Sequence, residues 1–310
     1  MKEHAIGVCS WSLRPVSATD LVDKITALGH VPSHAAGPPA EVVVPNGGTL
    51  GAAPTSNADG VDGDAWCIQL ALDPIRTGAW ALNDTIARLA DAGIAVRSGM
   101  MAMHGEDYST LETIRKTGGV RQDEHWERNL AAARDNARIA RALGLPLVTF
   151  HAGFMPDAPD DPMRSKMLTR LRAIIDEFAA VGVRTAFETG QESADTLLDA
   201  LGELDRDDTG VNFDPANMIL YAMGDPIAAL RKLAPRVYQI HIKDAIATEQ
   251  PGTWGREVVV GTGDVDWPAL FQVYRESGLD CDLIIERESG HTRTNDVRHA
   301  RHLVESLIER

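Results

Sequence analysis

Four side chains that can bind a metal ion each stand at the end of a short apolar segment. They are Glu188 after RTAF, Asp214 after GVNF, His241 after VYQI and Glu286 after DLII. Because none is near another along the chain, they can act together only if the segments are parallel strands whose carboxyl ends meet at one pocket. Three carboxylates and one imidazole form a ligand set for a divalent cation. The sequence therefore predicts a metal site at one end of a parallel barrel.

Alternating polarity places these residues on the inner face of the predicted strands. In VYQIHIKD, the polar residues Gln239, His241 and Lys243 share one face, because side chains two positions apart point the same way. Singly, a strand-end His or Asp is often structural or caps a helix. Four on consecutive strands favour metal binding, since buried carboxylates without a partner are costly. Oxygen-rich ligation with one imidazole favours Mn²⁺, with Mg²⁺, Co²⁺ or Zn²⁺ as alternatives.

Strand-like and helix-like segments alternate eight times, which predicts a single α/β domain over residues 1–310 with the (β/α)₈ TIM-barrel fold. One segment, 31–65, breaks the alternation between the first helix and the second strand. Of its 35 residues, 11 are Gly or Pro, which predicts a flexible, irregular insertion. We expect it on the N-terminal face, away from the pocket. A partner contact or a minor strand at 41–44 is the alternative.

The predicted helices cover about 17–29, 79–92, 124–143, 163–181, 193–204, 225–234, 267–277 and 293–309. The clearest helical period lies in WERNLAAARDNARIARALG, where apolar residues recur at three- and four-residue steps before Gly144.

Composition limits the classes of partner. The chain has 310 residues, is 44% hydrophobic and carries a formal net charge of −15, which disfavours nucleic acid and anionic membranes. It shows no signal peptide and no apolar run long enough to span a membrane, so a cytoplasmic location is the expectation. Cys9, Cys67 and Cys281 form no CxxC pair, and we expect small buried thiols.

The motifs TFHAGF, AFETG, NFDPAN, HIKD, GTGDVDW and IIERE together resemble the xylose isomerase-like TIM-barrel superfamily of sugar phosphate isomerases and epimerases. The resemblance covers nearly all of the chain except 31–65. It implies that Glu188, Asp214, His241 and Glu286 bind one metal ion. Glu188 and Glu286 would also be the catalytic pair that removes and returns a proton. A small carbohydrate substrate and a homo-oligomer, often a dimer or tetramer in this family, are further implications.

Two departures from the family pattern narrow these implications. Asn217 stands where endonuclease relatives place a second metal-binding His, and GTGDVDW lacks their Asp-x-His pair. A multinuclear zinc site and DNA repair are therefore disfavoured. Many ketose epimerases keep a His at the position of Asn217 as a substrate contact, so its absence also weighs against simple ketose 3-epimerisation.

Several other residues are candidates for binding the substrate. His151 in TFHAGF could bond a hydroxyl or shuttle a proton, or be a structural His. Lys243 could steady an oxyanion, or form a salt bridge with Asp244 or Glu249. Arg256 could reach a hydroxyl, carboxylate or phosphate, or be solvated.

For the remaining candidates a structural role is an equal or stronger alternative. Glu192 could orient a metal ligand, or be solvated near a helix cap at Ser193. Gln69 and Trp11 could line the sugar pocket, although core packing is the stronger expectation for Trp11. The glycines of GTGDVDW resemble a phosphate loop only weakly, since they also form an ordinary turn before a helix.

These observations favour a metal-dependent sugar or sugar phosphate isomerase or epimerase that abstracts a proton to form an enediolate. A metal-dependent lyase or hydratase acting on 3-oxo-sugars or 3-oxo-glycosides is the alternative, because that reaction also begins with proton removal beside a carbonyl. A non-catalytic sugar-binding protein is a third interpretation. The presence of three converging carboxylates argues against it.

Overall fold

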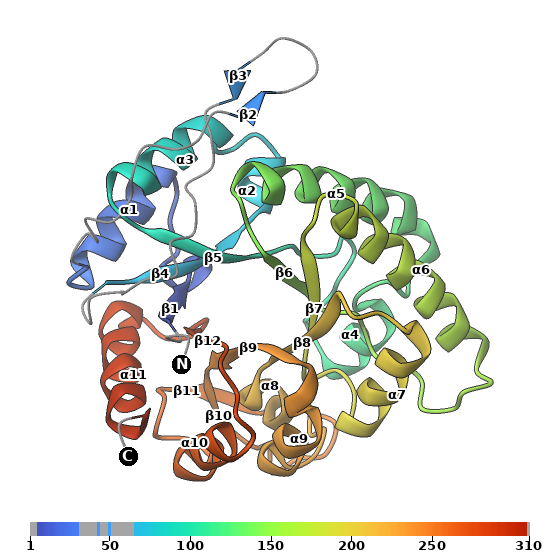
Figure 1. Cartoon of the computed structure of the whole chain (residues 1–310). Coiled ribbons are helices and arrows are strands. Elements are labelled where there is room, and N and C mark those ends of the chain that lie inside the picture. Colours follow the sequence, from blue (N-terminus) through green and yellow to red (C-terminus); the bar gives the residue numbers. More distant parts are fainter. Residues whose placement is uncertain (1–4, 31–41, 44–48, 51–64, 309–310) are drawn as a thin grey trace.

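A computed structural model describes residues 5–30, 42–43, 49–50 and 65–308 of the chain. Eight parallel strands form a closed barrel in the order β1-β12-β9-β8-β7-β6-β5-β4, and helices surround it (Figure 1). The barrel strands are β1 (Ile6–Cys9), β4 (Cys67–Ala71), β5 (Ala95–Met100), β6 (Leu147–Phe150), β7 (Arg184–Glu188), β8 (Thr209–Phe213), β9 (Val237–Ile242) and β12 (Asp282–Ile285). The predicted TIM barrel is confirmed.

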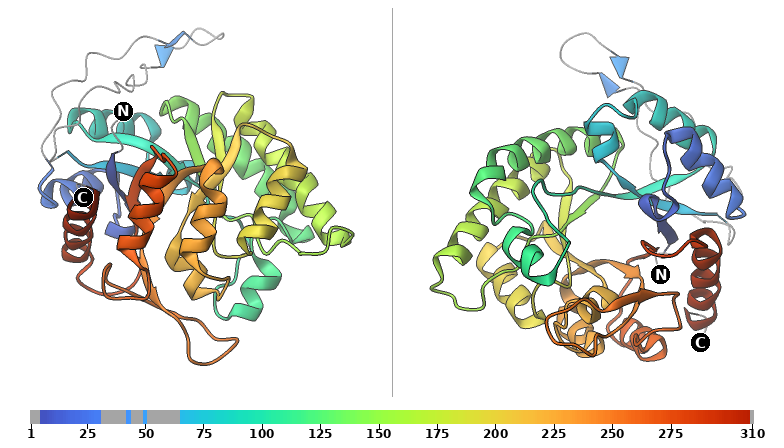
Figure 2. Two further views of the ribbon diagram at one scale, coloured as in Figure 1. Left: turned by 60° about the horizontal axis from the view of Figure 1, so that its bottom comes forward. Right: turned by 180° about the vertical axis from the view of Figure 1, so that it is seen from behind.

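Helices follow the barrel strands as the sequence predicts, with bounds shifted by a few residues. They are α1 (Ala18–Ala27), α3 (Leu82–Asp91), α5 (Asp123–Ala142), α6 (Pro162–Ala179), α7 (Ala194–Leu204), α9 (Pro226–Leu233), α10 (Trp267–Glu276) and α11 (Arg293–Ile308). The last barrel strand, β12, pairs with the first, β1, which closes the barrel (Figure 2). None of the described helices combines the length and apolarity needed to cross a membrane.

Several short elements were not predicted because they are built from loop residues. They are η1 (Ser10–Leu13), α2 (Asp73–Arg76), α4 (Leu111–Thr117), α8 (Pro215–Leu220), η2 (Ala234–Arg236) and the antiparallel pair β10 (Asp244–Ile246) and β11 (Arg256–Val258). Helix α4 begins with a capping box, in which Thr110 and Thr113 bond each other's backbone N–H. Helix α8 begins with Pro215 directly after Asp214.

Most of the predicted insertion lies outside the described residues, so its expected flexibility and its place on the N-terminal face stay predictions. Within it the structure describes two short strands, β2 (Val42–Val43) and β3 (Thr49–Leu50), paired antiparallel. The alternative of a minor strand at 41–44 therefore agrees with the structure at the two residues of β2.

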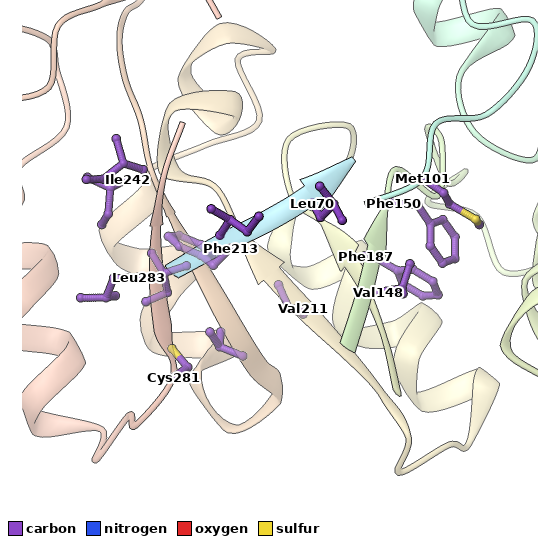
Figure 3. Packing of buried hydrophobic residues seen from close by; sticks show 14 of the residues in the cluster. Leu70, Met101, Val148, Phe150, Phe187, Val211, Phe213, Ile242, Cys281 and Leu283 are labelled. Carbon is purple, nitrogen blue, oxygen red and sulfur yellow. The ribbon is translucent and has the colours of Figure 1, made fainter. Parts of the chain in front are cut away.

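The two faces of the barrel strands differ sharply in chemistry. Apolar strand residues pack with the helices in one hydrophobic cluster, where Figure 3 shows Val148, Phe187 and Val211 among others. Polar side chains bond one another between strands: Ser98 Oγ donates to Gln239 Oε1 at 2.6 Å, and Gln239 Nε2 donates to Asn212 Oδ1 at 3.0 Å. A barrel interior is ordinarily filled by branched apolar residues. The polar side chains inside this barrel therefore indicate a functional site at this end of the barrel.

Candidate metal centre

The four predicted metal ligands converge on one point at the carboxyl ends of β7, β8, β9 and β12. Each offers one ligand atom, and these four atoms lie within 4.8 Å of one another. Nδ1 of His241 is 3.6 Å from Glu188 Oε1, 3.6 Å from Asp214 Oδ2 and 3.4 Å from Glu286 Oε2. All four residues are at most 3% exposed. The tertiary structure thus assembles the set that the sequence spaced over 99 positions, from 188 to 286.

Strand register explains why these residues meet. Residues paired across adjacent strands stand at one level, and Glu188 pairs with Asn212, which pairs with Gln239. Two residues further along each strand, Asp214 and His241 project from the same face at the next level. The Thr189 hydroxyl binds both the N–H and the carbonyl of Asp214, at 2.7 and 3.0 Å, which ties the ends of β7 and β8 together.

Gln69 contacts the imidazole of His241. Gln69 Nε2 donates to Thr149 Oγ1 at 2.7 Å, which leaves Gln69 Oε1 as an acceptor 2.7 Å from His241 Nε2. Nearby carboxylates hold the pKa of His241 well above its usual value against the effect of burial, and a metal ion at Nδ1 would need the neutral ring with its proton on Nε2. Gln69 is fully buried in β4. The structure places Gln69 against His241, and the expectation that it lines a sugar pocket stays a prediction.

The two predicted catalytic glutamates are each held by polar neighbours. Glu286 Oε1 accepts from Trp11 Nε1 at 2.7 Å, and Glu286 Oε2 accepts from Lys243 Nζ at 2.9 Å. Glu188 Oε1 accepts from Asn217 Nδ2 at 2.8 Å, and Glu188 Oε2 accepts from Asn212 Nδ2 at 3.2 Å.

These contacts add to the expected roles of two candidates. Trp11 packs against the small buried cluster that contains Cys9, Cys67 and Ile284, as core packing predicts, and its indole N–H also bonds Glu286. Asn217 stands beside Glu188. It bonds the carboxylate through its amide.

The electrostatics of the group call for a cation. Burial raises the pKa of Asp214 to about 6, despite the opposing charge of Lys243. Burial also opposes ionisation of Glu286, but Lys243 and His241 outweigh it and hold the pKa of Glu286 well below its usual value. In Glu188 burial is likewise outweighed by His151 and His241, so its pKa is lowered.

The residues present fit a divalent ion. Two fully buried atoms that point into the group, Asp214 Oδ2 and His241 Nδ1, have no hydrogen-bond partner. A buried atom without a partner is costly, and a cation held by these two atoms and the two glutamates would satisfy both. Cys9 Sγ lies 3.8 Å from the other imidazole nitrogen, and burial raises the pKa of this thiol, so we do not expect it to ligate a metal. All three cysteines are buried and free, as predicted.

His151 lies beside this group. Its Nε2 is 3.7 Å from Glu188 Oε1, and its Nδ1 is buried with no hydrogen-bond partner. The structure thus brings His151 next to a predicted catalytic residue with one ring nitrogen available.

Arg256 is not brought to the site in the same way. It is exposed on β11, and no contact among the described residues joins it to the four predicted ligands. The adjacent Glu257 reaches Arg287 instead, at 2.8 Å.

Lys243 and Asp244 do not form the predicted salt bridge. Lys243 Nζ pairs with Glu286 and with Glu288, and these carboxylates hold its pKa well above the usual value against the effect of burial. Asp244 Oδ2 accepts from the backbone N–H of Gly261 at 2.8 Å and of Gly263 at 3.1 Å. The loop GTGDVDW is therefore an ordinary structural turn built around a buried carboxylate.

Replacing this carboxylate tests its structural role. Asp244 also accepts from Ala245 N, Val265 N and Trp267 Nε1, so Asp244→Ala removes the acceptor of five donors. We expect the free energy of unfolding to fall by about 3 kcal/mol or more, measured by denaturant titration. Asp264→Ala is the matched control, because Asp264 is on the same loop and accepts the N–H of Ala247. Equal losses in the two variants would contradict the role of Asp244.

Glu192 is buried, which excludes the prediction of a solvated side chain. The helix cap of α7 is made by Ser193, whose side chain accepts from Thr196 N. Glu192 Oε1 has no hydrogen-bond partner, and burial raises the pKa of Glu192 to about 8. No contact among the described residues joins it to the metal ligands.

The raised pKa of Glu192 predicts a pH-dependent stability. The folded protein holds this proton up to about pH 8, whereas the unfolded chain releases it near the ordinary glutamate pKa of 4.5. Between these pH values the folded state binds more protons, so Glu192 makes the free energy of unfolding fall as pH rises. In this range the free energy of unfolding falls by about 1.4 kcal/mol for each pH unit. Between pH 5 and pH 9, the free energy of unfolding of Glu192→Gln should rise by several kcal/mol relative to that of the wild type, measured by urea titration. A pH-independent difference would contradict the assignment.

Sequence reasoning missed Glu106, which follows β5 on a loop. Glu106 Oε1 accepts from Gly119 N at 2.9 Å, and burial raises the pKa of Glu106 while His151 opposes the rise. The strand-end pattern could not reveal it, because Glu106 stands six positions beyond the end of β5 at Met100.

Solved structures share the fold of this chain along its whole length. A xylose isomerase domain protein from Planctomyces limnophilus is 28% identical with a TM-score of 0.77, covering 99% of this chain and 98% of the other. The probable 3-DHS dehydratase AsbF from Bacillus anthracis is 16% identical with a TM-score of 0.67, covering 97% and 98%. A D-allulose 3-epimerase from Methylomonas sp., solved with D-allulose, is 13% identical with a TM-score of 0.65, covering 99% and 98%.

Curated relatives match over shorter segments. The uncharacterized protein YihM of Escherichia coli (strain K12) is 39% identical over 75 residues, which are 24% of this chain and 23% of YihM. The inosose dehydratase of Clostridium tetani (strain Massachusetts / E88) is 27% identical over 94 residues, 26% of this chain and 32% of the relative. The matches thus span about a quarter to a third of these relatives. The family model of the xylose isomerase-like TIM barrel matches residues 68–309, and the chain belongs to this family.

Proposed function

We propose that the protein is a divalent-metal-dependent isomerase or epimerase of sugars or sugar phosphates, acting by proton abstraction beside a carbonyl. The observation that supports this most is the convergence of Glu188, Asp214, His241 and Glu286, with ligand atoms within 4.8 Å of one another. Neighbours in fold include a 3-epimerase solved with its sugar. Two glutamates at one centre supply the pair of proton carriers that such a reaction needs.

The residues of the chain divide into holding and proton-transfer roles. Asp214 and His241 would hold the metal, because Asp214 Oδ2 and His241 Nδ1 point into the group and have no hydrogen-bond partner. Glu188 and Glu286 would each remove or return a proton, one on either side of the reacting carbon. Trp11 and Asn217 fix the orientation of Glu286 and Glu188 through one hydrogen bond each. His151, 3.7 Å from Glu188, would carry a proton or bind a substrate hydroxyl.

Mn²⁺ is the ion that this oxygen-rich set with one imidazole would favour, with Mg²⁺, Co²⁺ or Zn²⁺ as alternatives. Bound there, a divalent ion would polarise the substrate carbonyl and lower the energy of the enediolate form of the substrate.

Dehydration is the second candidate, supported by two comparisons. A curated relative is an inosose dehydratase, and a structural neighbour is a probable 3-DHS dehydratase. The same pair of glutamates could remove a proton beside a 3-oxo group and assist departure of a hydroxyl or aglycone. Asn217 at the position of an epimerase His fits this alternative, since a family substrate contact is changed there.

Proton exchange in D₂O separates the candidates. The metal-loaded protein is incubated with free ketoses, aldoses, their phosphates and 3-oxo-glycosides, and products are followed by NMR. Deuterium in a rearranged sugar is the result expected of the isomerase, and loss of water or an aglycone is expected of the lyase. Absence of exchange with every metal and every sugar would overturn both.

A further inference from the structure

Lys243 is the cation nearest the candidate metal centre, and all of its donors are used. An ammonium group has three N–H donors and no acceptor. Nζ of Lys243 lies 2.9 Å from Glu286 Oε2, 2.8 Å from Glu288 Oε2 and 3.2 Å from Asn217 Oδ1. The three bonds account for the three donors. Lys243 therefore holds side chains of the protein and has no donor left for an anionic group of a substrate.

Backbone donors of the neighbouring loop are used in the same way. A phosphate cradle needs free backbone N–H groups that point at the ligand. Gly261 N and Gly263 N both donate to Asp244 Oδ2, a carboxylate of the protein itself. A Cβ at Gly263 would lie 2.2 Å from Asp244 Oδ1, which shows how closely the loop wraps this side chain. The loop after β9 therefore offers no anion site at these glycines.

Two arginines on the same side of the barrel are also committed or flanked by acids. Arg287 donates to Asp296 Oδ2 at 2.9 Å and to Glu257 Oε1 at 2.8 Å. Arg293 Nη1 contacts the Trp11 carbonyl at 3.5 Å, its Nε is buried with no hydrogen-bond partner, and the carboxylates of Glu257 and Glu288 favour its charge. Of these two arginines, Arg293, at the rim of the site, is therefore the one that is more available to an anionic ligand.

Charge at the centre stays negative after a metal ion is counted. Glu188, Asp214 and Glu286 are joined by Glu288, the carboxylate that pairs with Lys243. Four carboxylates exceed one ammonium by three charges, and a divalent ion neutralises two of them. In the described part of the chain, the centre and Lys243 therefore keep about one negative charge, which repels an anionic group placed close by.

We infer that the substrate is an uncharged sugar or oxo-polyol, with neither a phosphate nor a carboxylate group, and that Glu288 enforces this choice by occupying Lys243. The inference rests on the proposed function and narrows it. Glu288 suits this role because its side chain is 52% exposed and lies outside the predicted ligand set, while its Oε2 is 2.8 Å from Lys243 Nζ. It is a specificity residue at the mouth of the site.

Binding of a matched pair of unreactive polyols tests the inference without any need for turnover. Ribitol and ribitol 5-phosphate are titrated into the full-length, Mn²⁺-loaded protein by calorimetry, with inorganic phosphate titrated alone to detect direct binding of the anion. We expect ribitol to bind at least about tenfold more tightly than its phosphate. Glu288→Gln should shrink this preference by about fivefold, since it removes a negative charge and weakens the bond that occupies Lys243. Glu276→Gln, a surface change near Arg231, should leave it unchanged.

The outcomes separate this inference from the proposed function. Tighter binding of ribitol 5-phosphate would overturn the inference, and Arg293→Gln would then show whether the rim arginine holds the phosphate. Binding of neither polyol would also overturn it. If Glu288→Gln keeps the wild-type preference for ribitol over its phosphate, Glu288 does not enforce the choice of substrate. If the protein prefers ribitol but exchanges deuterium on no sugar, the charge selectivity stands. Only the proposed isomerase and lyase activities are then overturned.

Discussion

Glu286→Gln is expected to lower turnover by about a thousandfold while the fold is kept. Glutamine retains the size of the side chain and can still accept the bond from Trp11 Nε1, which lies 2.7 Å from Glu286 Oε1. It cannot take up a proton in the reaction, and it weakens the bond with Lys243. The loss should appear in kcat with every sugar that the wild type accepts, measured by deuterium exchange at saturating Mn²⁺.

The control for this variant is Glu276→Gln, which makes the same change on the exposed end of α10. Both proteins should give the circular dichroism spectrum of the wild type. A Glu286→Gln protein with rates near the wild type would show that another residue is the base, and His151 beside Glu188 would then be the first to replace.

Asp214→Asn is expected to abolish metal binding without weakening the metal-free fold. The two carboxylate oxygens have separate tasks: Oδ1 caps α8 by accepting from Asn217 N at 2.9 Å, and Oδ2 faces the centre with no partner. Asparagine is an equally good helix cap, so it keeps the first task. Its amide nitrogen has no lone pair for a cation, so we expect metal affinity to fall by at least about 100-fold, measured by equilibrium dialysis.

Stability measurements check the same variant independently. Metal at 100 times its dissociation constant should stabilise the wild type by about 2.7 kcal/mol and leave the variant unchanged. Because the pKa of Asp214 is raised from 3.8 to about 6 in the metal-free protein, its ionisation lowers the free energy of unfolding progressively between these two pH values, and the full cost remains above pH 6. Metal-free Asp214→Asn should therefore be at least as stable as the metal-free wild type at pH 8. A large loss of stability in the metal-free state would contradict the separation of the two oxygens.

The strand-end pattern sufficed to predict both the barrel and the four ligands. Parallel strands that alternate with helices have one closed arrangement in which every carboxyl end meets the others, and period-two polarity selects the inner face. Glu188, Asp214, His241 and Glu286 satisfied both conditions, and the structure brings them within 4.8 Å. Such local patterns can be read from a sequence because they depend on neighbours two to four residues away.

Partners across the barrel could not be predicted in this way. For Lys243 the sequence left open an oxyanion contact or a salt bridge with Asp244 or Glu249. In the structure Asp244 accepts from the loop that ends at Trp267, and Lys243 donates to Glu286. Gln69 serves His241, which is 172 residues away along the chain. These pairings depend on strand register and on competition among buried donors, neither of which local spacing contains.

By itself, the sequence determined the fold family, the identity of the four candidate ligands and the burial of the three thiols, because each follows from periodicity or residue type. Only the tertiary structure decided which neighbours hold the glutamates, that Glu192 is buried without a partner, and that Arg256 stays exposed. The physical reason is that a buried polar atom must find its partner in three dimensions. The same long-range pairing leaves Lys243 with no donor free, which is the basis for expecting an uncharged substrate.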